Sequence, residues 1–315
     1  MRIFRHDKVA AADRGAVVAI GNFDGVHLGH QRVIGIAGER AHTLGAPHAV
    51  LTFEPHPRSV FRPDDPPFRL TPFRVKSRRL DALGVDLLFT LHFDLAFAAK
   101  SAEAFIAEVL VEGIGARAVV AGYDFVFGHK RRGDAALLRA RGQALGFGVD
   151  IVGPVEAEDG IAYSSTHIRE HLTAGRPRQA AALLGRFWEI DGRVERGDQR
   201  GRTIGFPTAN IFLQDYLRPA AGVYAVRAGI EEGSGTHWRD AVANFGRRPT
   251  FGGSDLRLEV HLFDYAGELY GRHLRVALVD FLRPEQKFAG IDALKAQIAA
   301  DAARARTILA AMPAF

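Results

Sequence analysis

The 315-residue sequence contains no cysteine. Disulfide bonds, thiolate zinc sites and cysteine nucleophiles are therefore excluded, and a chain without disulfides suits a reducing cytoplasm. No apolar run approaches the roughly 18 residues of a membrane span. Residues 1–14 mix charges of both signs and lack the apolar centre of a signal peptide. We therefore expect a cytoplasmic protein that makes no membrane contact.

A long basic stripe is also missing, although the net charge is +5. Lysine and arginine gather in short clusters beside glycine, at residues 130–133 and 196–202, without the interleaved aromatic residues of many nucleic-acid surfaces. Arginine clusters of this kind suit small molecules that carry phosphate. We expect no nucleic-acid partner, and a basic RNA-binding protein is the alternative.

The first half of the chain alternates apolar strand-like segments with helical patterns. The apolar segments are residues 16–20, 49–53, 85–91, 117–121 and 150–152. Strands that alternate with helices over about 150 residues predict a doubly wound parallel sheet, because parallel neighbours need long crossover connections. The expected fold class here is a Rossmann-like α/β domain.

The pattern changes near Gly185. Short alternating segments joined by turns follow, at residues 188–193, 222–227, 239–244, 256–263 and 274–281. They predict an antiparallel β-barrel, and residues 291–309 predict a terminal helix that packs on it. We therefore predict two domains, residues 1–185 and 186–315.

Residues 21–30 read Gly-Asn-Phe-Asp-Gly-Val-His-Leu-Gly-His, between an apolar strand and a helical pattern at residues 31–44. Glycines allow a sharp turn close to a ligand, and the amides of the following helix N-terminus favour an anion. His27 and His30 share the first helical turn. These donors suit nucleotidyl transfer from a triphosphate, which needs charge stabilisation and no covalent nucleophile. An ordinary turn with two surface histidines is the alternative.

Three further segments are expected at the carboxyl ends of strands, where open α/β sheets bind ligands. Residues 54–58 carry two prolines and predict a rigid loop. Residues 122–128 offer aromatic faces for a ring such as adenine or isoalloxazine, or form a plain surface turn. Residues 164–169 either cap a helix or bind the β- and γ-phosphates.

The second half offers one glycine-rich segment and one polar strand face. Residues 197–210 predict a mobile flap that closes over phosphates, and they lack the ending of a Walker loop. Residues 256–263 alternate, so that Glu259 points away from the aliphatic face. By residue type alone Glu259 is a solvated glutamate.

These motifs resemble those of one family. Residues 21–30 are similar to the His-x-Gly-His signature of nucleotidylyltransferases, in the form of the bacterial bifunctional riboflavin kinase/FAD synthetase family. Pro-Thr-Ala-Asn at 207–210 and Glu-Val-His at 259–261 resemble flavokinase segments, as do residues 244–251 and 281–288. Residues 164–169 are also similar, with His167 where the family commonly has arginine.

The resemblance implies that the barrel phosphorylates riboflavin with ATP and Mg²⁺, and that the α/β domain transfers AMP from a second ATP to FMN. FAD and pyrophosphate are the products. A single-activity adenylyltransferase, whose barrel only binds or regulates, is an alternative. No motif indicates an oligomeric state.

The resemblance also implies the site residues. Thr208 and Asn210 would hold Mg²⁺ and phosphates, and Glu259 would be the general base of the kinase. His27 and His30 would be catalytic in adenylyl transfer. The other expected residues are Gly21, Asn22, Phe23, Asp24, Gly29, Ser164, Ser165, Thr166 and Arg169 for ATP, Asp124 and Phe125 for the flavin or nucleotide, and Gly201, Arg202 and Gly205 for the flap.

Overall fold

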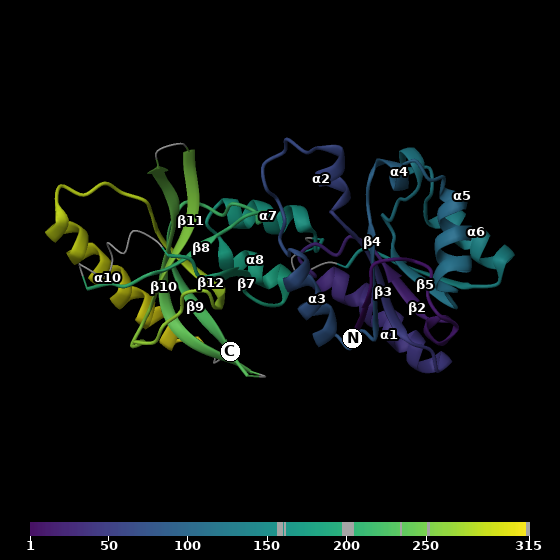
Figure 1. The fold of residues 1–315 in the computed structure, drawn as a ribbon, viewed down its shortest axis with the longest axis horizontal. Helices are drawn as coiled ribbons and strands as arrows, with labels where there is room; N and C mark the ends of the chain where they lie inside the picture. The colour runs from purple at the N-terminus through teal and green to yellow at the C-terminus, as the bar shows by residue number, and fades with distance from the viewer. Residues whose placement is uncertain (156–159, 161, 197–204, 234, 251–252, 313–315) are drawn as a thin grey trace. The chain divides into compact units, whose positions relative to one another are not determined.

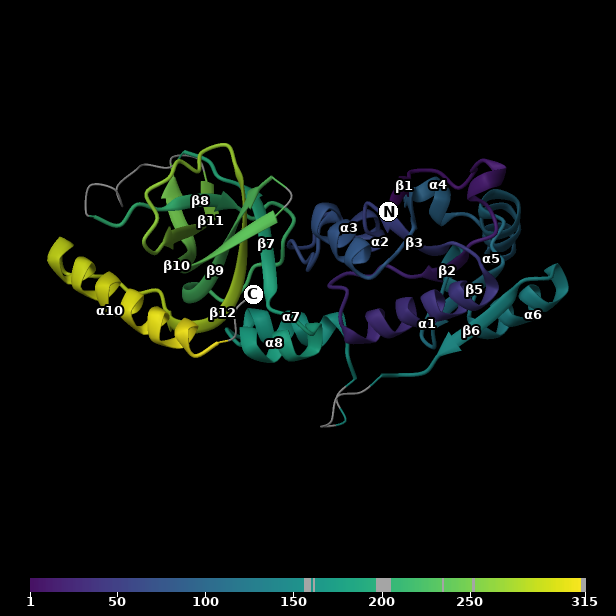
Figure 2. The ribbon, with the colours of Figure 1, turned by 90° about the horizontal axis from the view of Figure 1, so that it is seen from below.

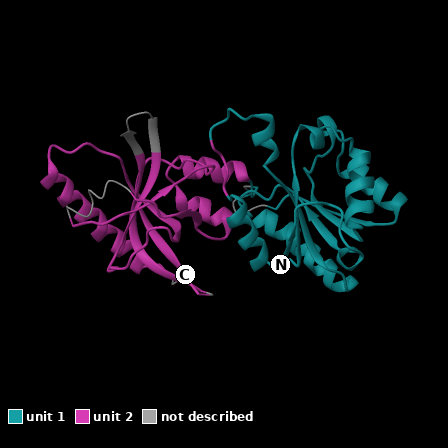
Figure 3. Ribbon diagram, in the orientation of Figure 1, with its two compact units in different colours: residues 1–66, 71–164 teal, residues 67–70, 165–315 magenta. Residues whose placement is uncertain are grey.

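The structure is a computed structural model, and it describes all residues except 156–159, 161, 197–204, 234, 251–252 and 313–315. The chain forms two compact units (Figure 3). The N-terminal unit comprises Met1–Pro66 and Thr71–Ser164, and the C-terminal unit comprises Pro67–Leu70 and Ser165–Phe315. Each unit has its own six-stranded sheet. Among the described residues, no helix is long and apolar enough to cross a membrane.

The sheet of the N-terminal unit is parallel throughout, in the order β1-β4-β3-β2-β5-β6. Figure 1 labels the central strands β2 to β5 of this sheet. Its strands are β1 (Arg2–Phe4), β2 (Val17–Ile20), β3 (His48–Glu54), β4 (Leu87–His92), β5 (Ala118–Gly122) and β6 (Gly148–Val152). From β2 the chain adds β3 and β4 on one side, and it then returns to add β5 and β6 on the other. The strand order therefore reverses between β2 and β5, and ligands bind at such a point in open α/β sheets.

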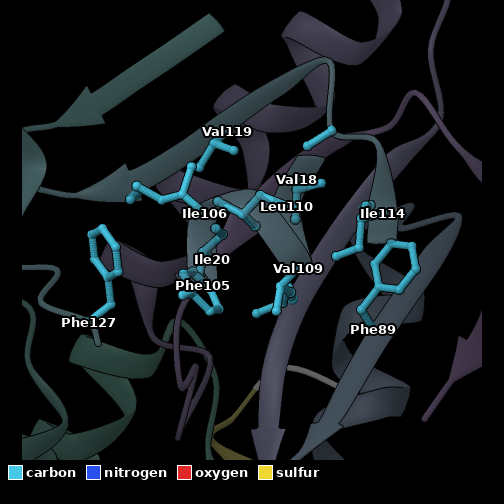
Figure 4. Packing of buried hydrophobic residues seen from close by; sticks show 14 of the residues in the cluster. Val18, Ile20, Phe89, Phe105, Ile106, Val109, Leu110, Ile114, Val119 and Phe127 are labelled. Atoms are coloured by element: carbon cyan, nitrogen blue, oxygen red, sulfur yellow. The ribbon is translucent and has the colours of Figure 1, made fainter. Parts of the chain in front are cut away.

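Both faces of this sheet are covered, as a parallel sheet requires. Val18 and Ile20 of β2 pack into the cluster formed with the π-helical segment η2 (Phe105–Ile114), which Figure 4 shows from close by. Val17 and Ala19 point to the other face, where α1 (Leu28–Leu44) packs. The strands β2 to β5 thus contribute alternate side chains to two cores, and the predicted doubly wound sheet is confirmed.

The other helices of this unit are short or lie at its periphery. They are η1 (Ala11–Asp13), α2 (Pro57–Phe61), α3 (Phe73–Ala82), α4 (Leu95–Ala98), α5 (Ala102–Ala104), which continues into η2, η3 (His129–Arg131) and α6 (Ala135–Leu145). The rigid loop expected at residues 54–58 is wrong in its second half. Pro57 occupies the first turn of α2, where a proline loses no hydrogen bond and its fixed φ favours the helix.

The C-terminal unit contains an antiparallel sheet in the order β7-β12-β9-β10-β11-β8. Its strands are β7 (Trp188–Arg193), β8 (Ala209–Phe212), β9 (Gly222–Glu232), β10 (Gly235–Thr250), β11 (Gly253–Leu262) and β12 (His273–Pro284). The amide of Glu195, just after β7, donates to the carbonyl of Asn210 in β8 at 2.9 Å. This bridge joins the two edges of the curled sheet, so the antiparallel barrel is confirmed.

The terminal helix α10 (Ile291–Ala310) packs on the outside of this sheet (Figure 2). Ala305 and Leu309 are buried against Val223 and Val279. Arg283 of β12 donates to both carboxylate oxygens of the buried Asp301 at 2.7–3.0 Å. The predicted helix that packs on the barrel is therefore present, with an ion pair at its inner face.

Two further helices, α7 (Ser165–Thr173) and α8 (Pro177–Leu184), belong with the barrel by their contacts. The sequence pattern places the domain boundary after these helices, near Gly185, whereas the compact units divide between Ser164 and Ser165. The boundary between functional domains therefore stays a prediction.

Two leucines seven residues apart on α6 test the N-terminal core. Leu138 is fully buried and Leu145 is 46% exposed. We expect Leu138→Ala to lower the free energy of unfolding by about 2–5 kcal/mol, because it removes packed methyl groups and leaves a cavity. Leu145→Ala should change it by no more than about 0.5 kcal/mol. Urea titration followed by circular dichroism measures both, and equal losses would contradict the burial of Leu138.

Candidate functional site

The turn between β2 and α1 lies at the point where the strand order reverses. Phe23, Gly25 and Val26 all have positive φ, at 47°, 92° and 46°. His27 caps α1, and its Nδ1 accepts a hydrogen bond from the amide of His30 at 3.3 Å. A neutral imidazole that accepts at Nδ1 carries its proton on Nε2. The helix terminus thus leaves His27 with a donor on its other ring nitrogen.

The two predicted histidines lie together. The His27 and His30 rings stack with centroids 3.6 Å apart, and the Phe23 ring meets His30 edge-on at 5.3 Å. Two glycines make room for this group. A Cβ on Gly29 would lie 3.2 Å from the His27 ring, and one on Gly21 would lie 3.0 Å from the Phe23 ring. The nucleotide contacts expected of these residues remain predictions.

Asp24 is buried inside the turn, where it has a structural role. Its Oδ1 accepts hydrogen bonds from the amide and hydroxyl of Thr71, at 2.9 and 3.3 Å. The Thr71 hydroxyl in turn accepts from the amide of Gly25 at 2.8 Å. The carboxylate therefore fixes the turn from within, and its role toward ATP remains a prediction.

Sequence reasoning missed Lys76 of α3. Its side chain is fully buried, and its ammonium group donates to the carbonyl of Asn22 at 2.8 Å and to Glu54 at 3.2 Å. A lysine in a helical pattern ordinarily indicates a solvated face. One signal was present, because Lys76 precedes the buried Leu80 by four residues and thus shares the inner stripe of the helix.

The loop after β5 carries the predicted Asp124 and Phe125. Asp124 is exposed, while Phe125 is half-buried and stacks on Phe127 with centroids 5.3 Å apart. Phe127 is fixed because its amide and carbonyl bond those of Gly133, at 2.9–3.0 Å.

The loop also belongs to a larger group of phenylalanines that the sequence did not reveal. Neighbouring rings lie 5.3–6.5 Å apart. We call this the aromatic group: Phe53, Phe61, Phe93, Phe97, Phe105, Phe125 and Phe127. It gathers residues from the carboxyl ends of β3 and β4, from the loop after β5, and from the helical segments α2, α4 and η2. Phe61 is 59% exposed, so the group presents an apolar surface.

The residues predicted at 164–169 to bind the β- and γ-phosphates, which we call the phosphate clamp, are divided between the units. Ser164 belongs to the N-terminal unit, whereas Ser165, Thr166 and Arg169 belong to the C-terminal unit. Within the latter, Nε of Arg169 donates to the carbonyl of Phe68 at 2.9 Å. Phosphate binding by the clamp remains a prediction.

His171 lies on α7, the helix that carries Arg169. Burial, reinforced by the charges of Arg176 and His167, lowers the pKa of His171.

The barrel brings the other predicted residues together. Glu259 of β11 lies directly opposite Asn210 of β8 on one side and Asn244 of β10 on the other. Cross-strand partners point to the same face, so the three polar side chains form a row across the sheet. Leu258 and Val260 are fully buried while Glu259 is half-buried, which confirms the predicted alternation.

The segment that enters β8 is held beside this row. The ring of His261 bonds the carbonyl of Pro207 through Nδ1 at 2.8 Å, and it meets Phe206 edge-on. Thr208 is half-buried. Residues 209–210, the end of the expected flap, lie in β8 instead.

The rest of the expected flap is described only at its end. Gly205 is exposed with φ of 89°, in the region that favours glycine. Gly201 and Arg202 lie outside the described residues.

Comparisons with known proteins cover both units. Residues 9–167 match the family model of FAD synthetase, and residues 184–309 match that of riboflavin kinase. The bifunctional riboflavin kinase/FMN adenylyltransferase of Escherichia coli K12 is 43% identical over 97% of both chains. The protein of the same name from Bacillus subtilis is 38% identical over 94% of this chain and 93% of its own. The chain belongs to this bifunctional family.

One solved structure is also similar to this chain over nearly its whole length. A chain from Streptococcus pneumoniae, described as a macrolide-efflux protein, superposes with a TM-score of 0.85. It is 34% identical and covers 97% of this chain and 98% of its own length. The family models and the curated relatives confirm the resemblance inferred from the motifs at the level of the family.

The hydroxyl of Thr71 offers a test of the turn. We expect Thr71→Val to lower the stability of the N-terminal unit by about 1–3 kcal/mol, because the buried amide of Gly25 loses its acceptor. Thr71→Ser keeps the hydroxyl and should lose less. Urea unfolding by circular dichroism measures the loss. Tryptophan fluorescence is the internal control, since Trp188 and Trp238 are the only tryptophans and both lie in the C-terminal unit. A loss confined to the fluorescence transition would contradict the assignment.

Proposed function

We propose that this chain converts riboflavin to FMN in its barrel and FMN to FAD in its α/β domain, with ATP as the second substrate of both reactions. The observation that carries the proposal is that each unit brings together some of the residues of one family motif set. His27 and His30 stack at the reversal of strand order in one sheet, and Asn210 and Glu259 pair across strands in the other. The functional boundary is proposed near Gly185, after α8.

In adenylyl transfer, a phosphate oxygen of FMN attacks the α-phosphate of ATP, and the bond to the β-phosphate breaks to release pyrophosphate. No proton has to be removed from an ionised phosphate, so the protein's task is to stabilise charge. His27 and His30 would donate to the α-phosphate, next to the amides of the α1 N-terminus. Gly21, Asn22, Phe23 and Gly29 would let the phosphates approach the backbone.

The same domain needs a surface for the flavin. The isoalloxazine ring is flat and aromatic, and the aromatic group offers offset and edge contacts with such a ring. We propose that Phe125 and the exposed Phe61 contact it, with Asp124 at its polar edge. Ser164, Ser165, Thr166 and Arg169 are proposed to bind the β- and γ-phosphates.

In the kinase reaction, the primary hydroxyl of riboflavin attacks the γ-phosphate of ATP and ADP leaves. Glu259 would take the proton of that hydroxyl as its bond to phosphorus forms. The strand fixes its carboxylate on the polar face, beside the amide side chains of Asn210 and Asn244. Gly201, Arg202 and Gly205 are proposed to act in the phosphate flap.

The oxygen atoms of Thr208 and Asn210 fit Mg²⁺, which prefers oxygen ligands and is commonly shared between one or two protein groups and the substrate phosphates. When bound, Mg²⁺ supplies positive charge to the phosphates of ATP. We propose a cytoplasmic location, where ATP is available, and no nucleic-acid partner.

One incubation tests the function as a whole. The protein with riboflavin, ATP and Mg²⁺ should form FMN and FAD, which chromatography separates. FMN without FAD, even when FMN is supplied, would contradict the adenylyltransferase. FAD made only from supplied FMN would favour the single-activity alternative. Absence of both products together with salt-dependent RNA binding would favour the RNA-binding alternative.

His30→Ala tests the adenylyl-transfer site. We expect FAD formation from FMN to slow about 10²–10³-fold, because one donor to the α-phosphate is lost while the helix terminus remains. Riboflavin phosphorylation should not change. His42→Ala, at the exposed end of the same helix, is the matched control and should leave both rates intact. An equal fall of both activities in His30→Ala would indicate damage to the fold instead.

Glu259→Gln separates the two reactions. It keeps the shape of the side chain but removes the proton acceptor, so FMN production should slow about 10²–10⁴-fold. Supplied FMN should still become FAD at the normal rate. Glu231→Gln, the same change on β9 of the same barrel, is the control. Normal phosphorylation of riboflavin by Glu259→Gln would reduce Glu259 to a solvated strand residue.

A further inference from the structure

Lys76 is a buried cation that the reaction as described does not use. No part of its side chain is exposed. Its Nζ lies 2.8 Å from the carbonyl oxygen of Asn22, 3.2 Å from Oε1 of Glu54 and 3.4 Å from Oγ1 of Thr52. Three acceptors match the three N–H bonds of an ammonium group. Burial of such a charge is costly unless it is paired, so a buried lysine at this position indicates a specific role.

The Asn22 carbonyl is the contact that links Lys76 to the site. It accepts hydrogen bonds from Lys76 and, at 3.1 Å, from the Thr52 hydroxyl. Both donors act on the peptide that leads into Phe23, whose φ of 47° is unusual for a residue with a side chain. The Phe23 ring in turn meets the His30 ring. Lys76 therefore fixes the backbone that orients the aromatic neighbour of His30.

The second contact concerns charge. Glu54 ends β3, at the edge of the sheet where the turn also lies, and its side chain is 18% exposed. An uncompensated carboxylate at this edge would repel the phosphates of a nucleotide. The buried ammonium at 3.2 Å offsets that charge.

We propose that Lys76 is a positioning residue for adenylyl transfer: it holds the Asn22 carbonyl so that the turn keeps His30 in place, and it neutralises Glu54. It acts through the turn and does not touch the nucleotide. The proposal rests on the proposed function of the N-terminal unit. It makes two separable statements, one about the geometry of the turn and one about the charge of Glu54.

The experiment compares Lys76→Met, Glu54→Gln and the double variant in the full-length protein, with FMN and ATP as substrates. Lys76→Met should lower kcat of adenylyl transfer about 100-fold, the effect of misplacing one donor, and should raise KM for ATP. The double variant should recover KM, because position 54 no longer carries a negative charge, but it should not recover kcat. Riboflavin phosphorylation serves as the internal reference and should stay at the wild-type rate.

Leu80→Ala, one turn along α3, is the control for stability. Its side chain is fully buried in the same apolar core as Phe23 and Val26, but it carries no polar group that could bond the turn, so Leu80→Ala should lower stability and leave kcat near the wild-type value. A kcat of the double variant within twofold of wild type would overturn the proposal, as would an equal loss of kcat in Leu80→Ala at matched stability. Where Lys76→Met does not fold, the double variant, which buries no unpaired charge, gives the same comparison.

These outcomes are distinct from failure of the proposed function. If the wild-type protein forms no FAD from FMN, the assignment of the α/β domain fails. If the wild-type protein forms FAD and Lys76→Met does so equally well, only the role of Lys76 fails.

Discussion

Buried polar contacts hold the turn between β2 and α1, and the candidate adenylyl-transfer site depends on them. A turn with positive φ at Phe23 and Val26 is unfavourable by itself, so its surroundings must fix it. Asp24 and Thr71 bond it from within, and Lys76 bonds its carbonyl. The strand and the helix place the turn, but these side chains determine its shape. The stacked histidines depend on that shape.

The barrel positions its polar side chains without a special turn. Glu259, Asn210 and Asn244 need no special turn, because strand register alone places them side by side. Their spacing follows from the separation of adjacent strands, and their common direction follows from the pleat. The two units therefore position polar groups through a strained turn in one case and through regular pairing in the other.

Much of this could be predicted from the sequence, where the physical signal was local. Apolar runs predicted β2 to β6, and the alternation of residues 256–263 predicted which face of β11 carries Glu259. The stretch at residues 21–30 predicted the histidine pair at a helix N-terminus. Strand pairing was out of reach, because the opposition of Asn210 and Glu259 joins residues almost fifty positions apart.

Other features were missed because tertiary contacts decide them. Lys76 is buried only because Glu54, Thr52 and the Asn22 carbonyl surround it. The aromatic group assembles from strand ends, helical segments and the loop after β5. β8 follows a glycine-rich stretch and forms because β11 offers it an edge to pair with. No local pattern carries these arrangements.

The pairing of β8 with β11 limits how this region can change in length. Side chains alternate between the two faces of a strand. The deletion of a single residue between Ala209 and the end of β8 would therefore move the side chains on one side of the deletion to the opposite face of the sheet. The deletion or insertion of two residues would keep every side chain on its original face and would shift only the pairing of β8 along β11. Among descendants of this chain, length differences should therefore accumulate in the connections and spare β8 and β11. Where a strand length does change, an even number of residues preserves the polar row.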